Sequence, residues 1–163
     1  MNRSTGLAAS VAVLGLAFSA ATLAQTTKDI AGTYRTVSNV NTSADGKRTE
    51  VFGPKGTGMA IFTPEGRFTV VNVNPDTPKF ASNSRATGTA EENKAMVMGG
   101  IALFGTYTIS DGVLVMNVEA STYPNWTGTR QTRTLSSVTA DQIKWTLPGS
   151  VGGTSEVVYQ RMK

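Results

Sequence analysis

The chain has 163 residues, with 15 Lys and Arg against 11 Asp and Glu, so its formal net charge is +4. It contains neither Cys nor His, which excludes disulfides, thiol catalysis and thiolate metal sites and removes the usual general base at neutral pH. The mild positive charge is that of an ordinary solvated surface, and Lys47-Arg48 is the only adjacent basic pair, so we expect no nucleic-acid partner. The sequence has no phosphate loop and no nucleophile elbow, and we expect no cofactor, no metal site and no catalytic residues.

Residues 1–24 are predicted to be a secretory signal peptide. A short positively charged start precedes the small and apolar run Leu7 to Ala21, and small residues lead to a cleavage position after Ala24. The alternative is an uncleaved membrane anchor, because the uncharged run from Ser4 to Thr27 is long enough to span a bilayer. We expect cleavage, which leaves residues 25–163 as one domain without a membrane span, in the bacterial periplasm or secreted.

The rest of the chain is a succession of short strand-like segments separated by turn signals. Pro64-Glu65-Gly66 combines a preset φ with a residue that tolerates positive φ, and Asp111-Gly112 is a two-residue hairpin signal. Because strand follows strand without intervening helices, the sheet should be antiparallel, in a barrel or a sandwich. The predicted strands are residues 30–38, 48–52, 59–63, 67–73, 103–110, 113–122, 127–138, 142–147 and 156–162.

One segment departs from the strand pattern. Residues 74–88 are rich in Pro and small polar residues and predict a long loop, and residues 89–98 predict a short helix that begins with a capping box between Thr89 and Glu92. A helix of under three turns needs to dock in order to persist. We therefore interpret it as a lid or plug held by its apolar side chains, which are Ala95, Met96 and Met98.

Five short motifs follow one another in a familiar order. They are Gly32-Thr33-Tyr34-Arg35, the hairpin Phe62 to Phe68, the helix start Thr89 to Glu92, the strand Phe104-Gly105-Thr106-Tyr107, and the corner and strand Pro124 to Arg133. Together they resemble bacterial lipocalin-like domain proteins, over most of the chain after the signal segment. The resemblance implies an all-β fold, an antiparallel up-and-down barrel of about eight or nine strands around a cavity that can hold one small ligand.

The resemblance also has two departures. Tyr34 stands where lipocalins place a Trp on the barrel floor, and the resemblance implies that an Arg near the end of the chain, here Arg161, packs over it. Many relatives carry a His in the strand that reads Val115 to Val118 here. This chain has no His, so no role that depends on that residue is carried over.

Alternation along the strand 113–120 separates two faces. Asn117 and Glu119 share one face with valines, and we interpret that face as the barrel lumen, with Arg133 as a possible partner. The alternative is a structural ion pair, or a Glu119 that points into water. Aromatic residues on the strands and at the corner could line the same pocket or form ordinary core. The candidate ligand-binding residues are Phe68, Phe104, Tyr107, Asn117, Glu119, Trp126 and Arg133.

The sequence leaves three functions open. The first is a monomeric barrel that binds a small, partly apolar molecule, with polar anchors in the lumen. The second is an enzyme such as a cyclase or isomerase, with Glu119 or Tyr107 as proton donor or acceptor. The third is an envelope protein-interaction module that uses residues 74–88, which a solid barrel interior and an exposed apolar patch would favour.

Overall fold

A computed structural model of the chain describes residues 26–149 and 152–163. The predicted signal peptide, and with it the domain boundary after Ala24, lies outside the described residues. The elements in chain order are α1 (Thr27–Ile30), β1 (Gly32–Thr42), β2 (Arg48–Glu50), β3 (Thr57–Phe62), β4 (Arg67–Val73), α2 (Ala90–Met98), β5 (Gly100–Ser110), β6 (Val113–Ser121), the 3₁₀ turn η1 (Pro124–Trp126), β7 (Arg130–Val138), β8 (Gln142–Pro148) and β9 (Thr154–Arg161).

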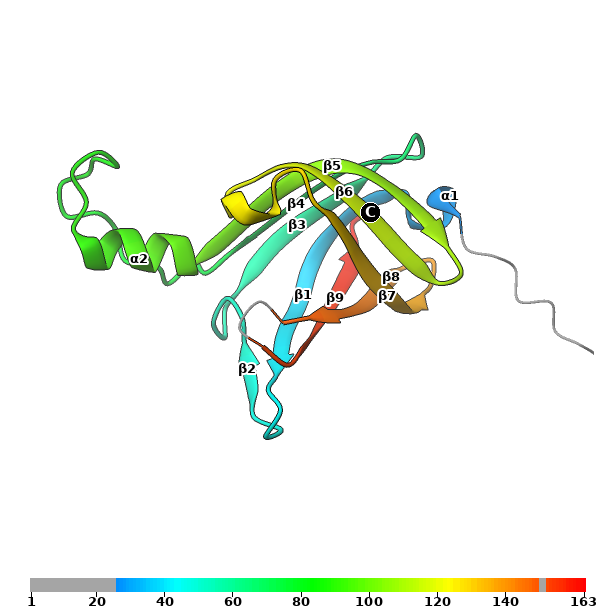
Figure 1. Ribbon diagram of the computed structural model, residues 1–163, viewed down its shortest axis with the longest axis horizontal. Coiled ribbons are helices and arrows are strands. Elements are labelled where there is room, and N and C mark those ends of the chain that lie inside the picture. The colour runs from blue at the N-terminus through cyan, green and yellow to red at the C-terminus, as the bar shows by residue number, and fades with distance from the viewer. Residues whose placement is uncertain (1–25, 150–151) are drawn as a thin grey trace, which may run out of the picture.

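Eight of these strands form a closed antiparallel barrel (Figure 1). Each strand from β3 to β9 pairs with the next, β1 pairs with β3, and β1 also pairs with β9, which closes the sheet. The ninth strand, β2, extends the sheet beside the end of β1, where Val40 is paired with Glu50. The predicted all-β barrel is therefore confirmed.

Tight turns at one end of the barrel set the register of two hairpins. The β3–β4 turn is closed by a hydrogen bond from Gly66 N to Thr63 O of 3.0 Å, and Gly66 has φ of 86°. In the β5–β6 turn, Asp111 and Gly112 have φ of 52° and 73°, the conformation that a two-residue hairpin turn requires. Both predicted turns are confirmed, and they fix which residues of these strands face inward.

The same end is filled by aromatic side chains. Phe62 lies at the centre of the cluster, with its ring centroid 5.2 Å from that of Tyr107 and 6.1 Å from that of Trp145 in edge-to-face contacts. Helix α1 covers this end and buries Ile30, which was predicted to begin the first strand, completely. Tyr34 donates to Ile30 O over 3.0 Å. We call this end, with α1 and the short turns, the closed end.

Arg161 packs over the ring of Tyr34 at the closed end, as predicted. Its guanidinium carbon lies 4.7 Å from the ring centroid. The same side chain donates to Ala31 O over 2.5 Å and to Ala140 O over 2.6 Å. A third, longer hydrogen bond goes to Asp29 O. Arg161 thus connects the last strand to the segment before β1 through hydrogen bonds and a cation–π contact.

Helix α2 does not dock, so its interpretation as a lid or plug is wrong. The predicted capping box is present, with Thr89 Oγ1 accepting from Glu92 N over 3.2 Å, but the helix has no buried residue. Figure 1 shows it projecting away from the barrel on an arm formed by residues 75–98. Val97 is 70% exposed, and hydrogen bonds within the arm replace the docking that a short helix usually needs.

Candidate functional site

The end of the barrel opposite α1 carries the long connections, and we call it the open end. The connection from β1 to β3, the α2 arm, the η1 corner and the β8–β9 connection all lie there (Figure 1). Four polar or charged residues are buried among the described residues, and each lies within three positions of the open end of its strand. They are Asn41, Asn72, Arg133 and Ser155.

We call these four residues the polar layer, and hydrogen bonds satisfy the polar groups of three of them. Asn41 accepts from Ser155 Oγ over 3.0 Å and donates to Gly152 O over 3.0 Å. Asn72 accepts from Thr36 Oγ1 over 2.7 Å and donates weakly to the Tyr159 hydroxyl over 3.5 Å. These bonds explain how amide groups remain inside a barrel, since a buried polar group without a partner is costly.

Burial shapes the chemistry of Tyr159 and the sequence of β3 beside this layer. Desolvation raises the pKa of the Tyr159 hydroxyl, which therefore stays protonated at neutral pH. Gly58 lies opposite Asn72, and a Cβ at that position would collide with the side-chain oxygens of Asn72 and Thr36. A glycine is needed there because the two hydrogen-bonded oxygens, Thr36 Oγ1 and Asn72 Oδ1, occupy the space that a Cβ would take.

Arg133 is the exception in the polar layer. Its side chain is inside the barrel and only 7% exposed, and it donates to Gln131 Oε1 over 2.6 Å and to Thr132 O over 2.8 Å. Both acceptors are neutral, and none of the ion pairs among the described residues includes Arg133. Burial lowers its pKa to about 10, so it is still a cation at neutral pH. A guanidinium has five N–H donors, so this one can still receive an anion.

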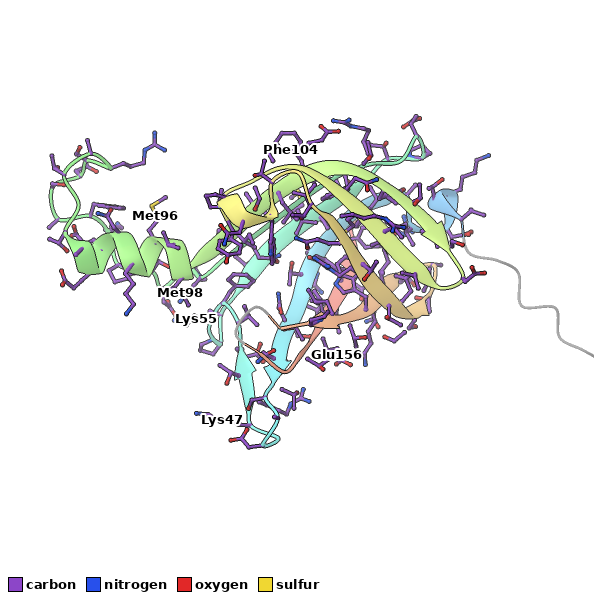
Figure 2. All side chains as sticks on the ribbon, in the orientation of Figure 1. Lys47, Lys55, Met96, Met98, Phe104 and Glu156 are labelled. Atoms are coloured by element: carbon purple, nitrogen blue, oxygen red, sulfur yellow. The ribbon has the colours of Figure 1, made fainter. Side chains whose placement is uncertain are left out.

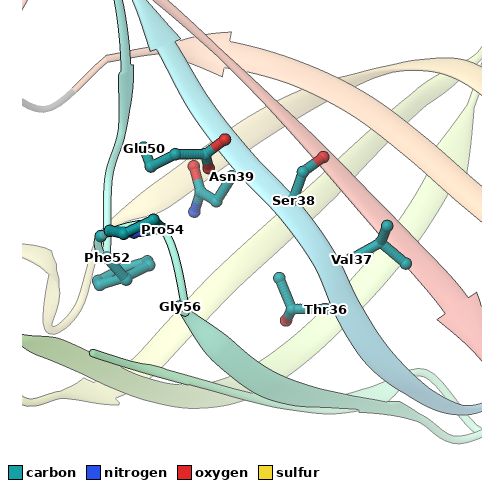
Figure 3. A pocket seen from close by; sticks show the side chains of 9 residues that line it. Thr36, Val37, Ser38, Asn39, Glu50, Phe52, Pro54 and Gly56 are labelled. Carbon is teal, nitrogen blue, oxygen red and sulfur yellow. The ribbon is translucent and has the colours of Figure 1, made fainter. Parts of the chain in front are cut away.

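A hollow lies where β1 changes partners. β1 pairs with β3 as far as Arg35 and with β2 from Val40, and a bulge lies between Thr36 and Ser38. The gap leaves a hollow of about 70 Å³, lined by residues 36–39, by Glu50, and by Phe52 with the turn that follows it (Figure 3). This volume accommodates a small polar group but is well below the ~300–1,000 Å³ of a drug-sized pocket.

The predicted lumen face of β6 is wrong. Leu114, Met116 and Val118 face inward and are 0%, 1% and 2% exposed, whereas Asn117 and Glu119 lie on the outer surface. The apolar face of the strand takes the core because burying three large side chains stabilises more than burying a pair of valines beside two polar groups. Alternation shows that there are two faces, but it does not say which one points inward.

Glu119 forms an exposed ion pair with a residue that the sequence did not suggest. Arg67 of β4 donates to both of its carboxylate oxygens, over 2.7 Å and 3.0 Å. The two side chains are 52% and 43% exposed, so the contact is a solvated pair on the barrel wall. Asn117 donates to the neighbouring Thr106 Oγ1 over 3.4 Å, also outside the barrel.

The aromatic candidates are spread over three places. Phe68 and Tyr107 belong to the closed-end core, where Tyr107 donates to Thr63 O over 2.7 Å. Phe104 is 47% exposed on the outer face of β5 (Figure 2), and Trp126 is half-buried in η1 with its ring centroid 5.6 Å from that of Tyr123. The structure therefore brings only Phe68 and Tyr107 together, and ligand contact by any of these residues stays a prediction.

Sequence reasoning missed the interior asparagines. Asn39 and Asn41 lie two apart on β1, and Asn72 follows Val70 and Phe68 at every second position of β4. Alternation along β4 could have found Asn72, because Phe68 and Val70 lie on the same inward face. It could not have found the two asparagines of β1, because the bulge between Thr36 and Ser38 changes the face on which they lie.

Neither a metal centre nor a membrane-spanning helix is found in residues 26–149 and 152–163. No three His, Cys, Asp or Glu side chains come close enough there to hold a metal ion. None of the helices in those residues is long and apolar enough to cross a bilayer.

A comparison with protein families bears directly on this barrel. The family model described as a lipocalin-like domain matches residues 31–156, from the start of β1 into β9. The chain belongs to the lipocalin-like domain family. The match covers seven of the eight barrel strands in full, the first three residues of β9 and the α2 arm of this lipocalin-like domain, and the family resemblance expected from its motifs is confirmed. Such a barrel is a fold that supports ligand binding.

Other comparisons add little to the family assignment. A search of curated proteins gave no match to this lipocalin-like domain. Among solved structures, it is similar to a redesigned β-barrel, with 16% sequence identity and a TM-score of 0.45 over 86% of this chain and 98% of that one.

Proposed function

We propose that this lipocalin-like domain is an exported, monomeric protein that binds a small, partly apolar molecule at the open end of its barrel, with Arg133 as the anchor for an acidic group. The observation that carries the proposal is a guanidinium inside the barrel whose hydrogen-bond acceptors among the described residues are both neutral. A buried charge without a counter-charge costs stability, so a site that retains one is a candidate for binding.

The ligand's carboxylate would replace a weaker acceptor. Gln131 Oε1 accepts from Arg133 in the free protein, and the Gln131 side chain is only partly buried and is tied to Thr129 Oγ1 by a 3.3 Å bond. A carboxylate would take its place because a hydrogen bond between two charged groups is stronger than one to a neutral amide. The deeper half of the barrel is filled by aromatic residues, which limits the ligand to a small molecule.

The proposal assigns no catalytic step to the barrel. Glu119 lies outside it and is paired with Arg67. Burial raises the pKa of Tyr107 to about 12, and its hydroxyl lies within hydrogen-bond distance of Thr63 O and Thr27 O. Neither residue is therefore in a position to move a proton at neutral pH for a molecule at the open end.

Export is proposed from the sequence of residues 1–24, with the mature domain in the periplasm or secreted. Mass spectrometry of the protein recovered from cells would test it. We expect a chain that begins at Gln25. Recovery of the intact N-terminus would contradict cleavage without affecting the binding proposal.

Thermal unfolding in the presence of a ligand panel tests the binding proposal. Aromatic carboxylic acids, fatty acids and terpenoid acids, each beside its neutral amide or alcohol, are added to the wild type, to Arg133→Met and to the exposed control Arg130→Met. A ligand that binds only the native state raises Tm. We expect an acid to raise Tm in the wild type and in Arg130→Met but not in Arg133→Met. Absence of a shift with every acid would overturn the proposal.

A second candidate function, a protein-interaction module, is favoured by the exposed apolar side chains of the α2 arm. Met96, Val97 and Met98 are 49%, 70% and 60% exposed. Figure 2 shows Met96 and Met98 on the arm, away from the barrel. Large apolar residues gathered on a protruding element are typical of contact surfaces. Sedimentation over a range of concentrations distinguishes the two functions. Self-association that Val97→Lys removes would favour the module, and a monomer at all concentrations would leave it without support.

A further inference from the structure

The hollow beside the β1 bulge is separate from Arg133 and presents the opposite chemistry. Its lining comes from β1, β2 and the turn after Phe52, whereas Arg133 lies on β7. One edge is fixed by the hydrogen bond from Val51 N to Asn39 O of 2.9 Å, which begins the pairing of β1 with the β2 segment. The hollow is thus built by backbone pairing on both sides of the gap in the barrel wall.

Two oxygen acceptors in this hollow have no partner among the residues that the structure describes. Asn39 Oδ1 is buried and accepts no hydrogen bond from any of them. The Glu50 carboxylate takes part in none of the ion pairs or side-chain hydrogen bonds found in residues 26–149 and 152–163. Figure 3 shows the polar ends of these two side chains directed toward the same space, with the ring of Phe52 on its far side.

We propose that this hollow is a binding site for a small organic cation, a primary ammonium or guanidinium group. A buried acceptor without a donor is costly, and the N–H groups of such a cation would satisfy Asn39 Oδ1. Its charge would face the Glu50 carboxylate, and the Phe52 ring adds a cation–π contact. The volume of about 70 Å³ fits a group of a few non-hydrogen atoms.

A bare metal ion fits this lining less well. Ca²⁺ takes six to eight oxygen ligands, and Mg²⁺ requires an octahedral set. Among the lining side chains, Glu50 supplies one carboxylate and Asn39 one amide oxygen, beside the ring of Phe52. The nearest lysine of the turn, Lys55, does not fill the hollow, because its ammonium group is paired with Asp76 at 3.2 Å.

The site goes beyond the proposed function, because it uses neither Arg133 nor an acidic ligand. Either proposal can fail while the other stands. Binding of an ammonium ion should be the same in Arg133→Met as in the wild type, and loss of the Tm shift with acids should leave the ammonium titration unchanged.

NMR titration of ¹⁵N-labelled protein with methylammonium chloride tests the site, with sodium chloride at equal ionic strength as the reference. We expect saturating shift changes at the Asn39 side-chain amide and at the Gly53 and Gly56 backbone amides. The affinity should be in the millimolar range, since a ligand of two non-hydrogen atoms cannot bind tightly. Tetramethylammonium, which has no N–H donor, should bind at least about 3-fold more weakly if Asn39 Oδ1 takes part.

Variants separate the site from general attraction of cations. Glu50→Gln keeps the shape and removes the charge, and we expect about a 10-fold loss of affinity or more. Glu65→Gln, an exposed glutamate in the β3–β4 turn, is the control and should bind like the wild type. Phe52→Leu should weaken binding by a smaller factor. Equal titration of the wild type and Glu50→Gln would overturn the proposal, as would an Asn39 Nδ2 that donates to Glu50 in the free protein.

Discussion

At the scale of single residues, the burial of the Arg133 charge is energetically unfavourable. Its guanidinium lies inside the barrel, and within the described part of the chain it is bonded to two neutral oxygens and forms no ion pair, so its burial reduces stability. Residues of this kind are expected where a site has been kept for binding and not for packing.

Arg133→Met should therefore stabilise the free protein. Removing the unpaired charge is expected to raise the free energy of unfolding by about 1 kcal/mol, even though Gln131 loses its donor. Urea denaturation of the wild type, Arg133→Met and Arg130→Met would measure this. A marked decrease specific to Arg133→Met would mean that Arg133 is a structural residue, which would remove the basis of the binding proposal.

Tyr107 ties three parts of the closed end together through one hydroxyl. It lies 2.7 Å from Thr63 O in the β3–β4 turn and 3.1 Å from Thr27 O in α1. Tyr107→Phe should lower the free energy of unfolding by roughly 1–2 kcal/mol, since buried acceptors lose their donor. Tyr123→Phe, at a 42% exposed position, is the control and should change stability little.

The same residue predicts how stability changes at alkaline pH. Burial raises the pKa of Tyr107 to about 12, so the unfolded chain loses this proton at lower pH than the folded protein. The contribution is fully present below pH ~10 and is lost as pH rises toward 12. Urea midpoints measured from pH 8 to 12 should fall more steeply in the wild type than in Tyr107→Phe. Parallel curves would contradict this.

Residue patterns in the sequence predicted the partners at the closed end better than those at the open end. Arg161 over Tyr34 followed from a family position, whereas the inward face of β6 was assigned to Asn117 and Glu119 and proved to be outward. Orientation depends on the register set by the whole barrel, and a local pattern with apolar residues on both faces leaves it undetermined.

At the scale of elements, the stability of the α2 helix is independent of the stability of the barrel. Its capping box was predictable because the interaction spans four residues, and its failure to dock was not, because docking depends on what the rest of the fold presents. The helix is held by Thr89, by Glu92 and by contacts within the arm, such as Glu92 Oε1 accepting from Ala81 N over 2.7 Å.

Thr89→Ala should loosen the helix and leave the barrel unchanged. Loss of the cap is expected to cost about 1 kcal/mol of local helix stability. Hydrogen exchange should become faster in residues 90–98 while Tm stays the same, because no residue of α2 is buried. A lower Tm would show that the arm supports the barrel.

Acid should loosen the same helix in the wild type. Hydrogen bonds from the Ala81 and Thr89 amides lower the pKa of Glu92. The contribution of this carboxylate to the stability of the helix is present above the unfolded-state pKa. It is lost as pH falls through the lower folded-state pKa. Glu92→Gln, followed by hydrogen exchange against pH, should remove most of this dependence.

At the scale of the whole molecule, the barrel does not need the arm. The insertion starts and ends at neighbouring points, since Asn74 N donates to Gly99 O over 2.6 Å and Val73 is paired with Gly100. Deleting residues 75–98 joins Asn74 directly to Gly99, and Asn-Gly is a favoured two-residue hairpin turn. We expect this deletion to fold with a Tm within a few degrees of the wild type, measured by circular dichroism. Failure to fold would show that the arm is needed to form the barrel.

The fold itself was largely predictable. Turn residues and unbroken succession of strands gave the antiparallel order, and each strand was found to within a few residues. The change of partner along β1 was not, because the bulge and the point at which β3 leaves β1 depend on pairing between distant parts of the chain. The hollow beside that bulge was therefore beyond sequence reasoning, even though its lining residues follow one another closely along the chain.

The closed end has a practical consequence for rearranging the chain. Met162 N donates to Thr33 O over 2.8 Å, so the two ends of the barrel sequence lie side by side next to α1. A short linker between them would allow circular permutation, with new ends opened within residues 80–86 of the α2 arm. No strand pairing would be cut, and the molecule could be displayed or fused through its open end instead of its closed one.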